Sequence, residues 1–358
     1  VSEDAMTAVA ECSGQNSVVL CDRGLMDSYA YCAPGGFDAA MQELNLNVEK
    51  CRDSRYESVI FLVSAADGAE EFYQTANNEA RHETADVARH LDKKLQEGWI
   101  GHPKLKLIKN DKSFARKVRT LRFVDEPLPL SCLRPFSSSC TFVSSLLFFL
   151  LLRLTAFVNH CTTQMEKAVS AVCSFVGLPR PSSSSRKFVL KSFPSADVMA
   201  QRVGHYTQHA VEETYLHTRD NRAHTRLRKR GDNVATTYKL RTKTLIQRGD
   251  SKTVAQHVEV SRLLNAREYI SLKNKADQRR TSLAKTRRSF IWENHYFELD
   301  EFTGITNPKT GSPLVTLKVG GEEDLVSLPF EEDVLEEATN ENTHQYSSYI
   351  LSLKQPEA

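Results

Sequence analysis

The chain has 358 residues, of which 40% are hydrophobic and 26% are charged, and this length and balance suggest two globular domains. Its eight cysteines are scattered, without a C-x-x-C pair or a His/Cys cluster at zinc spacing. This pattern argues against a disulfide framework and a zinc ribbon, and it favours reduced thiols in a cytoplasmic protein.

The net charge of +2 hides an uneven distribution along the chain. Residues 186–291 contain 24 Lys/Arg and 9 Asp/Glu, whereas residues 292–358 contain 3 and 14. A basic segment followed by an acidic one indicates either that the basic part binds a polyanion or that the two segments partly neutralise each other within the fold.

The first hundred residues alternate strand and helix signals. Apolar runs at residues 18–22, 57–64 and 105–108 predict strands, and the apolar spacing over 70–99 predicts a helix. This alternation is typical of a parallel sheet with helices on both faces, which binds ligands at the carboxyl ends of its strands. Asp22 lies at the end of the first strand, where an aspartate either holds magnesium opposite a phosphate loop or caps the next helix.

The phosphate loop that such an aspartate would face is not found in the sequence. No segment fits G-x-x-x-x-G-K-S/T, and the chain begins with Val1 rather than an initiator Met. We therefore expect an N-terminal fragment or a truncated gene model.

Residues 118–164 are rich in Ser, Leu and Phe and almost without acidic residues. A membrane span over 142–158 is one interpretation, but the run is short and carries Arg153 in its centre. A disordered insertion is a second interpretation. The favoured one is a retained intron, because splice-site sequences can encode Val118-Arg119 and Gln164, and the residues between them match a translated pyrimidine tract.

Beyond the linker that ends at Ser185, the pattern changes to short alternating strands separated by turn signals. This spacing is typical of an antiparallel sheet or barrel. The predicted strands cover residues 212–216, 225–230, 237–243, 257–260, 286–292, 296–299 and 313–319.

Three of these strands carry rows of cations, because side chains two residues apart share one face of a strand. If the rows faced the inside of a barrel, they would line a tunnel suited to a polyphosphate; the alternative is that they face solvent on an open sheet. Nucleic-acid binding is disfavoured, because no aromatic pairs are interleaved with the cations. Glu298 and Asp300 form an acidic face that pairs with the cations or holds a divalent ion. The candidate anion-binding residues are Arg226, Arg228, Lys239, Arg241, Lys285 and Arg287.

Several segments together resemble the TRPL translocation defect fourteen family, and they cover nearly all of the chain outside residues 118–164. The longest are VVLCDRGLMDSYAY, YESVIFLVSAADGAEEFY, NNEARHETADVARHLD and TRRSFIWENHYFELD. This family joins a NadR-like P-loop nucleotide-binding domain to a CYTH-like triphosphate-tunnel domain. The resemblance therefore implies an α/β P-loop NTPase-type parallel sheet, N-terminally truncated, over residues 1–117 and 165–179. It implies an α+β antiparallel CYTH-like β-barrel over residues 180–358.

The resemblance also implies ligands and sites. It implies GTP or ATP with Mg²⁺ at Asp22 and Arg23, and a phosphoinositide or another polyphosphate at the cationic rows. Arg81, on the predicted helix, is either a further nucleotide-binding residue over a phosphate or part of a solvated helix face. The E-x-E-x-K signature of the tunnel fold falls on Ser183, Ser185 and Lys187, so both glutamates are serines here. Residues 314–319 lack a further expected carboxylate, which leaves the metal-ligand candidates Asp22, Glu298 and Asp300.

The predicted function is a nucleotide- and phosphoinositide-binding protein of intracellular trafficking, cytoplasmic, with peripheral membrane contact and an unidentified protein cargo. The alternative is an enzyme, either a P-loop small-molecule kinase or NTPase, or a CYTH-type triphosphatase. In this alternative the metal-ligand candidates would carry the chemistry.

Overall fold

The computed structural model describes residues 2–14, 17–68, 70, 73, 83–110, 172, 185–220, 222–231, 236–246, 256–320, 327–338 and 345–354. The unusual segment 118–164, Arg81 and Ser183 lie outside the described residues. In the described part of the chain, none of the helices combines the length and the apolar character that a membrane crossing needs.

The chain divides into two compact units. The larger consists of Val1–Phe61, His90–Leu107 and Val172–Ala358, and the smaller of Leu62–Arg89 and Ile108–Ala171. The domain boundaries expected from the sequence, 1–117 with 165–179 and then 180–358, stay a prediction.

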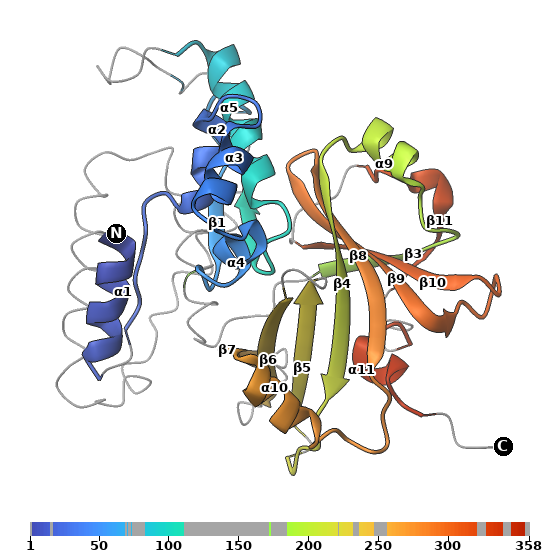
Figure 1. The fold of residues 1–358 in the computed structure, drawn as a ribbon. Helices are drawn as coiled ribbons and strands as arrows, with labels where there is room; N and C mark the ends of the chain where they lie inside the picture. Colours follow the sequence, from blue (N-terminus) through green and yellow to red (C-terminus); the bar gives the residue numbers. More distant parts are fainter. Residues whose placement is uncertain are drawn as a thin grey trace, which may run out of the picture. The chain divides into compact units, whose positions relative to one another are not determined.

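The N-terminal part contains short helices and a small parallel sheet (Figure 1). The sheet pairs β1 (Val59–Leu62) with β2 (Leu105–Ile108). The amide of Val59 donates to the Lys104 carbonyl, and the amide of Val63 to the Ile108 carbonyl, both at 3.0 Å. This constant offset along both strands is that of a parallel pair, as predicted. The helical elements are α1 (Ser2–Cys12), η1 (Leu25–Asp27), α2 (Ser28–Tyr31), α3 (Gly36–Glu43), α4 (Val48–Asp53) and α5 (Ala85–Trp99).

The predicted strand at residues 18–22 is wrong. Val18, Val19 and Leu20 are 52%, 38% and 69% exposed and belong to no strand. An apolar run becomes a strand only where a neighbour pairs with its backbone, and β1 and β2 are the two strands of the sheet that the described residues form here. The helix predicted over 70–99 is present from Ala85.

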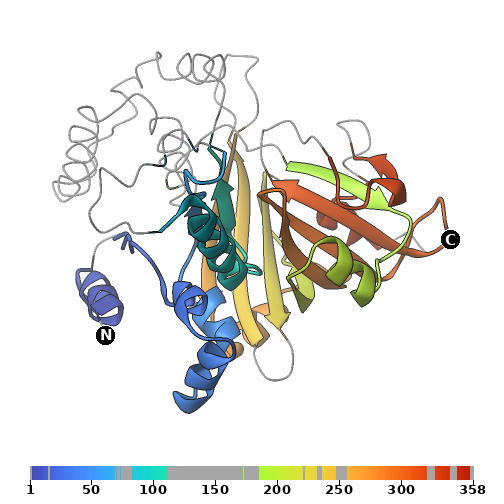
Figure 2. The same ribbon diagram turned by 90° about the horizontal axis from the view of Figure 1, so that it is seen from above.

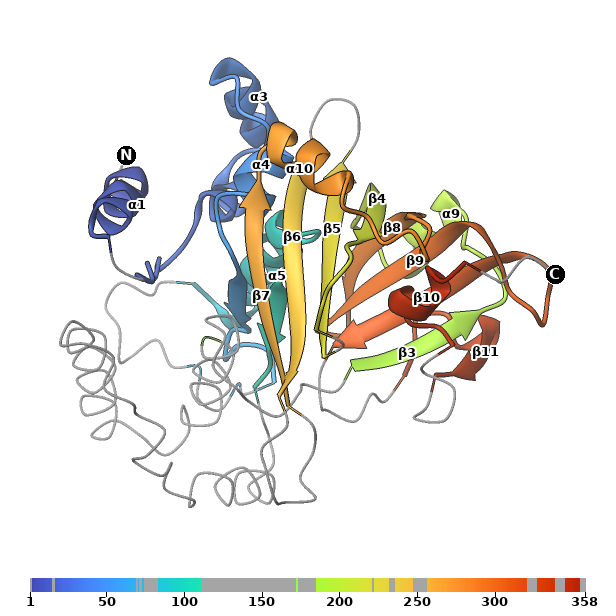
Figure 3. The same cartoon turned by 90° about the horizontal axis from the view of Figure 1, so that it is seen from below.

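The C-terminal part is built on one antiparallel sheet, in the order β11-β3-β10-β9-β8-β4-β5-β6-β7. Figure 3 shows β5, β6 and β7 running in a direction different from that of β3, β9 and β10, so the sheet is strongly twisted. The strands are β3 (Ser185–Leu190), β4 (Tyr206–Tyr215), β5 (Ala223–Gly231), β6 (Thr236–Ile246), β7 (Gln256–Leu264), β8 (Leu283–Trp292), β9 (His295–Thr306), β10 (Pro313–Gly320) and β11 (Val334–Glu337).

All seven strands predicted for this part are present, mostly with longer bounds, so the antiparallel sheet is confirmed. The sequence analysis did not predict β3 and β11 as strands. Closure into a barrel is not seen, because β11 and β7 are the two edges of the sheet and no pairing between them occurs among the described residues.

One face of the sheet, which we call the apolar face, carries the main core. Residues on β3, β8, β9 and β10 pack there against Met199 of α9 (Ala196–Arg202), the yellow-green helix of Figure 2. Farther along the same face, Leu227 and Leu264 pack against Tyr269 of α10 (Ala266–Lys273). Burying this face fixes the register of every strand and leaves the alternate side chains on the opposite face. A last short helix, α11 (Ser348–Leu351), precedes the C-terminus.

Replacing Leu317, which is fully buried on the apolar face, with alanine should lower the free energy of unfolding by roughly 2–5 kcal/mol. The loss arises because the removed side chain leaves a cavity among well-packed neighbours. Urea denaturation followed by circular dichroism measures the change. The control is Ile270→Ala, at a side chain of α10 that is 62% exposed, with an expected change within about 0.5 kcal/mol. Equal losses in the two variants would contradict this assignment of the core.

Candidate functional site

The face of the sheet opposite the apolar face, which we call the charged face, gathers ionised side chains from strands far apart in the sequence. Strands β3 to β10 present nine buried or half-buried cations and four such carboxylates there, which leaves a net charge of +5. The cations are Lys187, Arg226, Arg228, Arg230, Lys239, Arg241, Lys285, Arg287 and Lys318. The carboxylates are Glu213, Glu259, Glu298 and Asp300.

Glu213 of β4 lies at the centre of the charged face and is fully buried. Its Oε1 accepts from Arg228 Nε at 3.1 Å, and its Oε2 lies 3.3 Å from Arg226 Nη1 and 3.5 Å from Lys285 Nζ. Burial alone would raise the pKa of this carboxyl, but the three cations hold it well below its usual value. Glu213 is therefore ionised and joins β4, β5 and β8 through charge.

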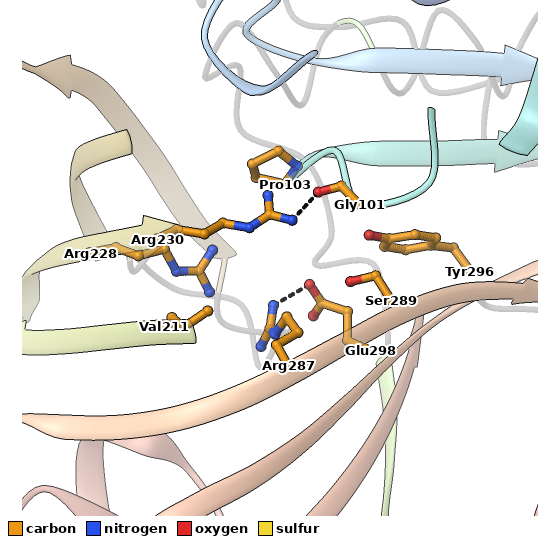
Figure 4. A pocket seen from close by; sticks show the side chains of 9 residues that line it. All are labelled: Gly101, Pro103, Val211, Arg228, Arg230, Arg287, Ser289, Tyr296 and Glu298. Atoms are coloured by element: carbon orange, nitrogen blue, oxygen red, sulfur yellow. Dashed lines mark hydrogen bonds and ion pairs between the residues drawn. The ribbon is translucent and has the colours of Figure 1, made fainter. Parts of the chain in front are cut away.

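A second cluster lies on β8 and β9. Asp300 accepts from Arg287 Nε at 2.6 Å and from Nη2 at 2.7 Å, a bidentate pair, and its Oδ2 lies 3.0 Å from Lys285 Nζ. Arg287 also donates to Glu298 (Figure 4). Burial alone would raise the pKa of Glu298, but Arg287 and Lys318 lower it to about 2. Both carboxylates are therefore ionised at neutral pH.

The next two strands of the sheet, β10 and β3, each add a lysine to the charged face. Lys318 of β10 pairs in register with Lys187 of β3 on one side and with Glu298 of β9 on the other. Lys187 Nζ donates to the Tyr346 carbonyl at 2.7 Å. Burial, together with the nearby charges of Lys285 and Lys318, lowers the pKa of Lys187 to about 8. The charged face thus holds a lysine that loses its proton more readily than usual.

Among the described residues of this face lies a shallow hollow with no enclosed space for a water molecule (Figure 4). Arg228, Arg230 and Arg287 line it together with Tyr296 and Glu298. The Nε of Arg230 is buried and has no hydrogen-bond partner among the described residues. The remaining lining residues are Gly101, Pro103, Val211 and Ser289.

Two acidic side chains from the N-terminal part of the same compact unit meet cations at one end of the charged face. Asp53, at the end of α4, lies 3.0 Å from Arg230 Nη1, and Arg230 also donates to the Gly101 carbonyl. Glu57 lies 3.4 Å from Lys239 Nζ and accepts from Ser261 Oγ at 2.6 Å. These contacts partly neutralise Arg230 and Lys239.

The structure brings all six anion-binding candidates of the sequence analysis onto the charged face, together with Glu298 and Asp300. The sequence analysis did not single out Glu213, Arg230 or Lys318 as site residues. Glu213 could have been found, because Glu213 and Tyr215 alternate with Glu212 and Thr214 in a predicted strand and the odd-numbered pair faces the cation rows.

The structure does not bring the predicted nucleotide-site residues Asp22 and Arg23 into a buried cluster. Asp22 and Arg23 lie exposed on a bend before η1. The residue that caps this turn is Asp27, whose carboxylate accepts from the Gly24 amide at 2.7 Å and from Trp99 Nε1 at 2.8 Å. The roles predicted for Asp22 and Arg23 in binding a nucleotide stay predictions.

The donor set of the charged face does not fit a divalent metal ion. Glu213, Glu298 and Asp300 each turn their oxygens toward arginine or lysine nitrogens, as described above. Within the described residues, no three His, Cys, Asp or Glu side chains gather closely enough to hold one metal ion. The metal roles predicted for Glu298 and Asp300 are therefore not supported by this arrangement.

Comparisons with known proteins concern the two parts of the chain separately. A family model described as an AAA domain matches residues 1–117. Among curated proteins, no match is found. This part of the chain is thus similar to AAA domains.

Solved structures resemble the C-terminal part. The hypothetical protein NE1496 is 22% identical, with 49% of this chain and 100% of that chain covered and a TM-score of 0.33. A structure titled as the inorganic triphosphatase NE1496 is 21% identical, with 50% and 99% covered and a TM-score of 0.33. A protein from Pyrococcus horikoshii OT3 is 16% identical, with 40% and 80% covered and a TM-score of 0.27. Similarity at this level says nothing about the activity of this chain.

Proposed function

We propose that the charged face binds a polyphosphate anion, such as a triphosphate. The observation that carries the proposal is the excess of nine cations over four carboxylates on one sheltered face. Cations that lose water on folding need a counter-charge, and the four carboxylates of the sheet together with Asp53 and Glu57 supply six of the nine charges. A polyphosphate would supply the remainder.

The kinds of cation on the charged face suit phosphate. Arginine offers a planar fork that matches two phosphate oxygens, and lysine offers a compact point charge. Arg228 and Arg287 line the hollow from β5 and β8, so a linear anion lying across β4, the strand between them, would meet both. Partial burial strengthens each contact, because water screens it less.

A phosphorylated lipid headgroup presents the same phosphate chemistry as a free polyphosphate chain. Binding to vesicles that contain a phosphoinositide, compared with binding to tripolyphosphate in solution, distinguishes the two sources. Hydrolysis of the bound anion is the alternative, and phosphate release from tripolyphosphate measures it.

For the N-terminal part we propose nucleotide binding, which the match of residues 1–117 to an AAA domain supports. GTP or ATP would bind with Asp22, Arg23 and Arg81 in the roles that the sequence analysis assigned. A fluorescent GTP or ATP analogue tests this proposal when it is titrated into both the unsubstituted protein and Arg228→Gln. The triphosphate of the analogue can also meet the charged face, so only binding that the substitution leaves unchanged belongs to the N-terminal part.

Arg228→Gln and Arg241→Gln should each weaken tripolyphosphate binding by about tenfold or more, because each removes a charged donor worth roughly 1.5–3 kcal/mol. Isothermal titration calorimetry on the full chain measures the dissociation constants. Both side chains lie on the charged face, while Glu213 keeps Arg226 and Lys285 as partners in either variant.

The matched control is Lys229→Gln. This residue lies on the same strand as Arg228, but on the apolar face opposite Glu212, and the substitution changes the net charge by the same amount. Affinity should stay within about twofold of the unsubstituted protein, a shift of roughly 0.4 kcal/mol. If the control weakens binding as much as the two test variants, the charged face is not the binding site.

Tripolyphosphate affinity should fall as the pH rises through about 8, because Lys187 then loses its charge. The sign follows from the lowered pKa: the lysine is cationic and attracts the anion below that pH, and it is neutral above it. Bound phosphate will itself favour the charged form, so the midpoint in the complex lies higher. The groups that face Lys187 are Lys285, Lys318, Arg287 and Asp300.

Isothermal titration calorimetry at pH values below and above 8, in wild-type protein and in Lys187→Met, measures this change in tripolyphosphate affinity. The variant should bind more weakly at neutral pH and lose the step in affinity. A step of unchanged size in Lys187→Met would assign the titration to another group.

A further inference from the structure

The carboxylates of the charged face are saturated with cations. Asp300 uses both oxygens, since Oδ1 accepts from Arg287 and Oδ2 accepts from Arg287 and lies 3.0 Å from Lys285 Nζ. Glu298 has Arg287 at Oε1 and Lys318 Nζ 3.9 Å from Oε2. Each of these four oxygens thus has a cationic nitrogen no farther than 3.9 Å away.

Strands β10 and β3 add further positive charge beside Glu298 and Asp300. On β10, Lys318 pairs in register with Glu298, and Thr316 pairs with Asp300. One strand farther, Lys318 pairs with Lys187. A divalent cation must approach carboxylate oxygens to about 2.0–2.1 Å, as magnesium does, and here it would lie among at least four cationic side chains. Like-charge repulsion and the loss of existing ion pairs both oppose its binding.

We infer that the charged face takes its polyphosphate as the free anion, without a divalent metal ion, and that arginine and lysine perform the charge neutralisation. The inference rests on the proposed function and adds the chemical form of the ligand. Divalent cations then act against binding, because they complex the polyphosphate in solution and lower its negative charge.

The carboxylates have a different part in this arrangement: they compete with the phosphate groups for the same guanidinium and ammonium groups. Glu298 holds one branch of Arg287, which also lines the hollow. Removing the charge of Glu298 frees that branch for phosphate. A metal-binding site predicts the opposite effect, since losing a ligand oxygen weakens the bridge between metal and phosphate.

The test is calorimetric titration of the full chain with sodium tripolyphosphate, once with excess EDTA and once with excess magnesium chloride. Binding should persist in EDTA and weaken by about tenfold or more in magnesium. Binding that requires magnesium overturns the inference and leaves the proposed function standing. The absence of binding in both buffers contradicts the proposed function itself, and the inference with it.

A pair of variants gives a second readout in the EDTA buffer. Glu298→Gln should keep or increase the affinity for tripolyphosphate, whereas a weaker affinity would overturn the inference. Glu212→Gln is the control, because it removes the same charge from the apolar face, where Glu212 lies 2.6 Å from Lys273 Nζ. Its affinity should match that of the unsubstituted protein. Thermal unfolding of both variants verifies that each remains folded, and if Glu298→Gln is unfolded, the buffer comparison alone decides.

Discussion

The ion pairs of buried Glu213 are the interaction on which the charged face depends. Arginine and lysine side chains cannot be taken out of water unless a counter-charge goes with them, because the desolvation penalty of an unpaired ion is several kcal/mol. Glu213 contacts cations from two other strands and is fully buried. Asp300 supplies the counter-charge of Arg287 and Lys285, both on β8. With these two carboxylates in place, the sheet can hold more positive than negative charge on one face.

The opposite face makes this arrangement possible. Its packed apolar residues, with α9 and α10 against them, fix the register of the strands. Because side chains alternate, the same register that buries Leu227 and Phe290 directs Arg228 and Arg287 to the charged face. Core packing and anion site are thus two consequences of one hydrogen-bond register, and a slip of one residue would destroy both.

The sequence predicted the site better than its surroundings. The cationic rows and the acidic pair of β9 follow from two-residue alternation, a local rule, and the structure places them on one face, while their role in binding an anion stays a prediction. The prediction of a strand at residues 18–22 was wrong, since an apolar run does not show whether another strand pairs with its backbone. The metal-binding roles predicted for Glu298 and Asp300 also depend on partners from other strands, and these partners are arginine and lysine nitrogens. Carboxylates near a predicted anion site are compatible with a metal or with ion pairs, and the neighbouring strand decides which.

By itself, the sequence determined the two fold classes, seven of the nine strands of the antiparallel sheet and the identity of the cations that share a face, because these depend on residues close together in the chain. The tertiary structure alone decided that Glu213 contacts Arg226 and Arg228, that Lys318 lies in register between Lys187 and Glu298, and that the described sheet stays open. Strand order and long-range register set these relations. Each relation joins positions separated by more than ten residues, and the energy of the whole packed sheet, rather than any local preference, selects among the possible pairings.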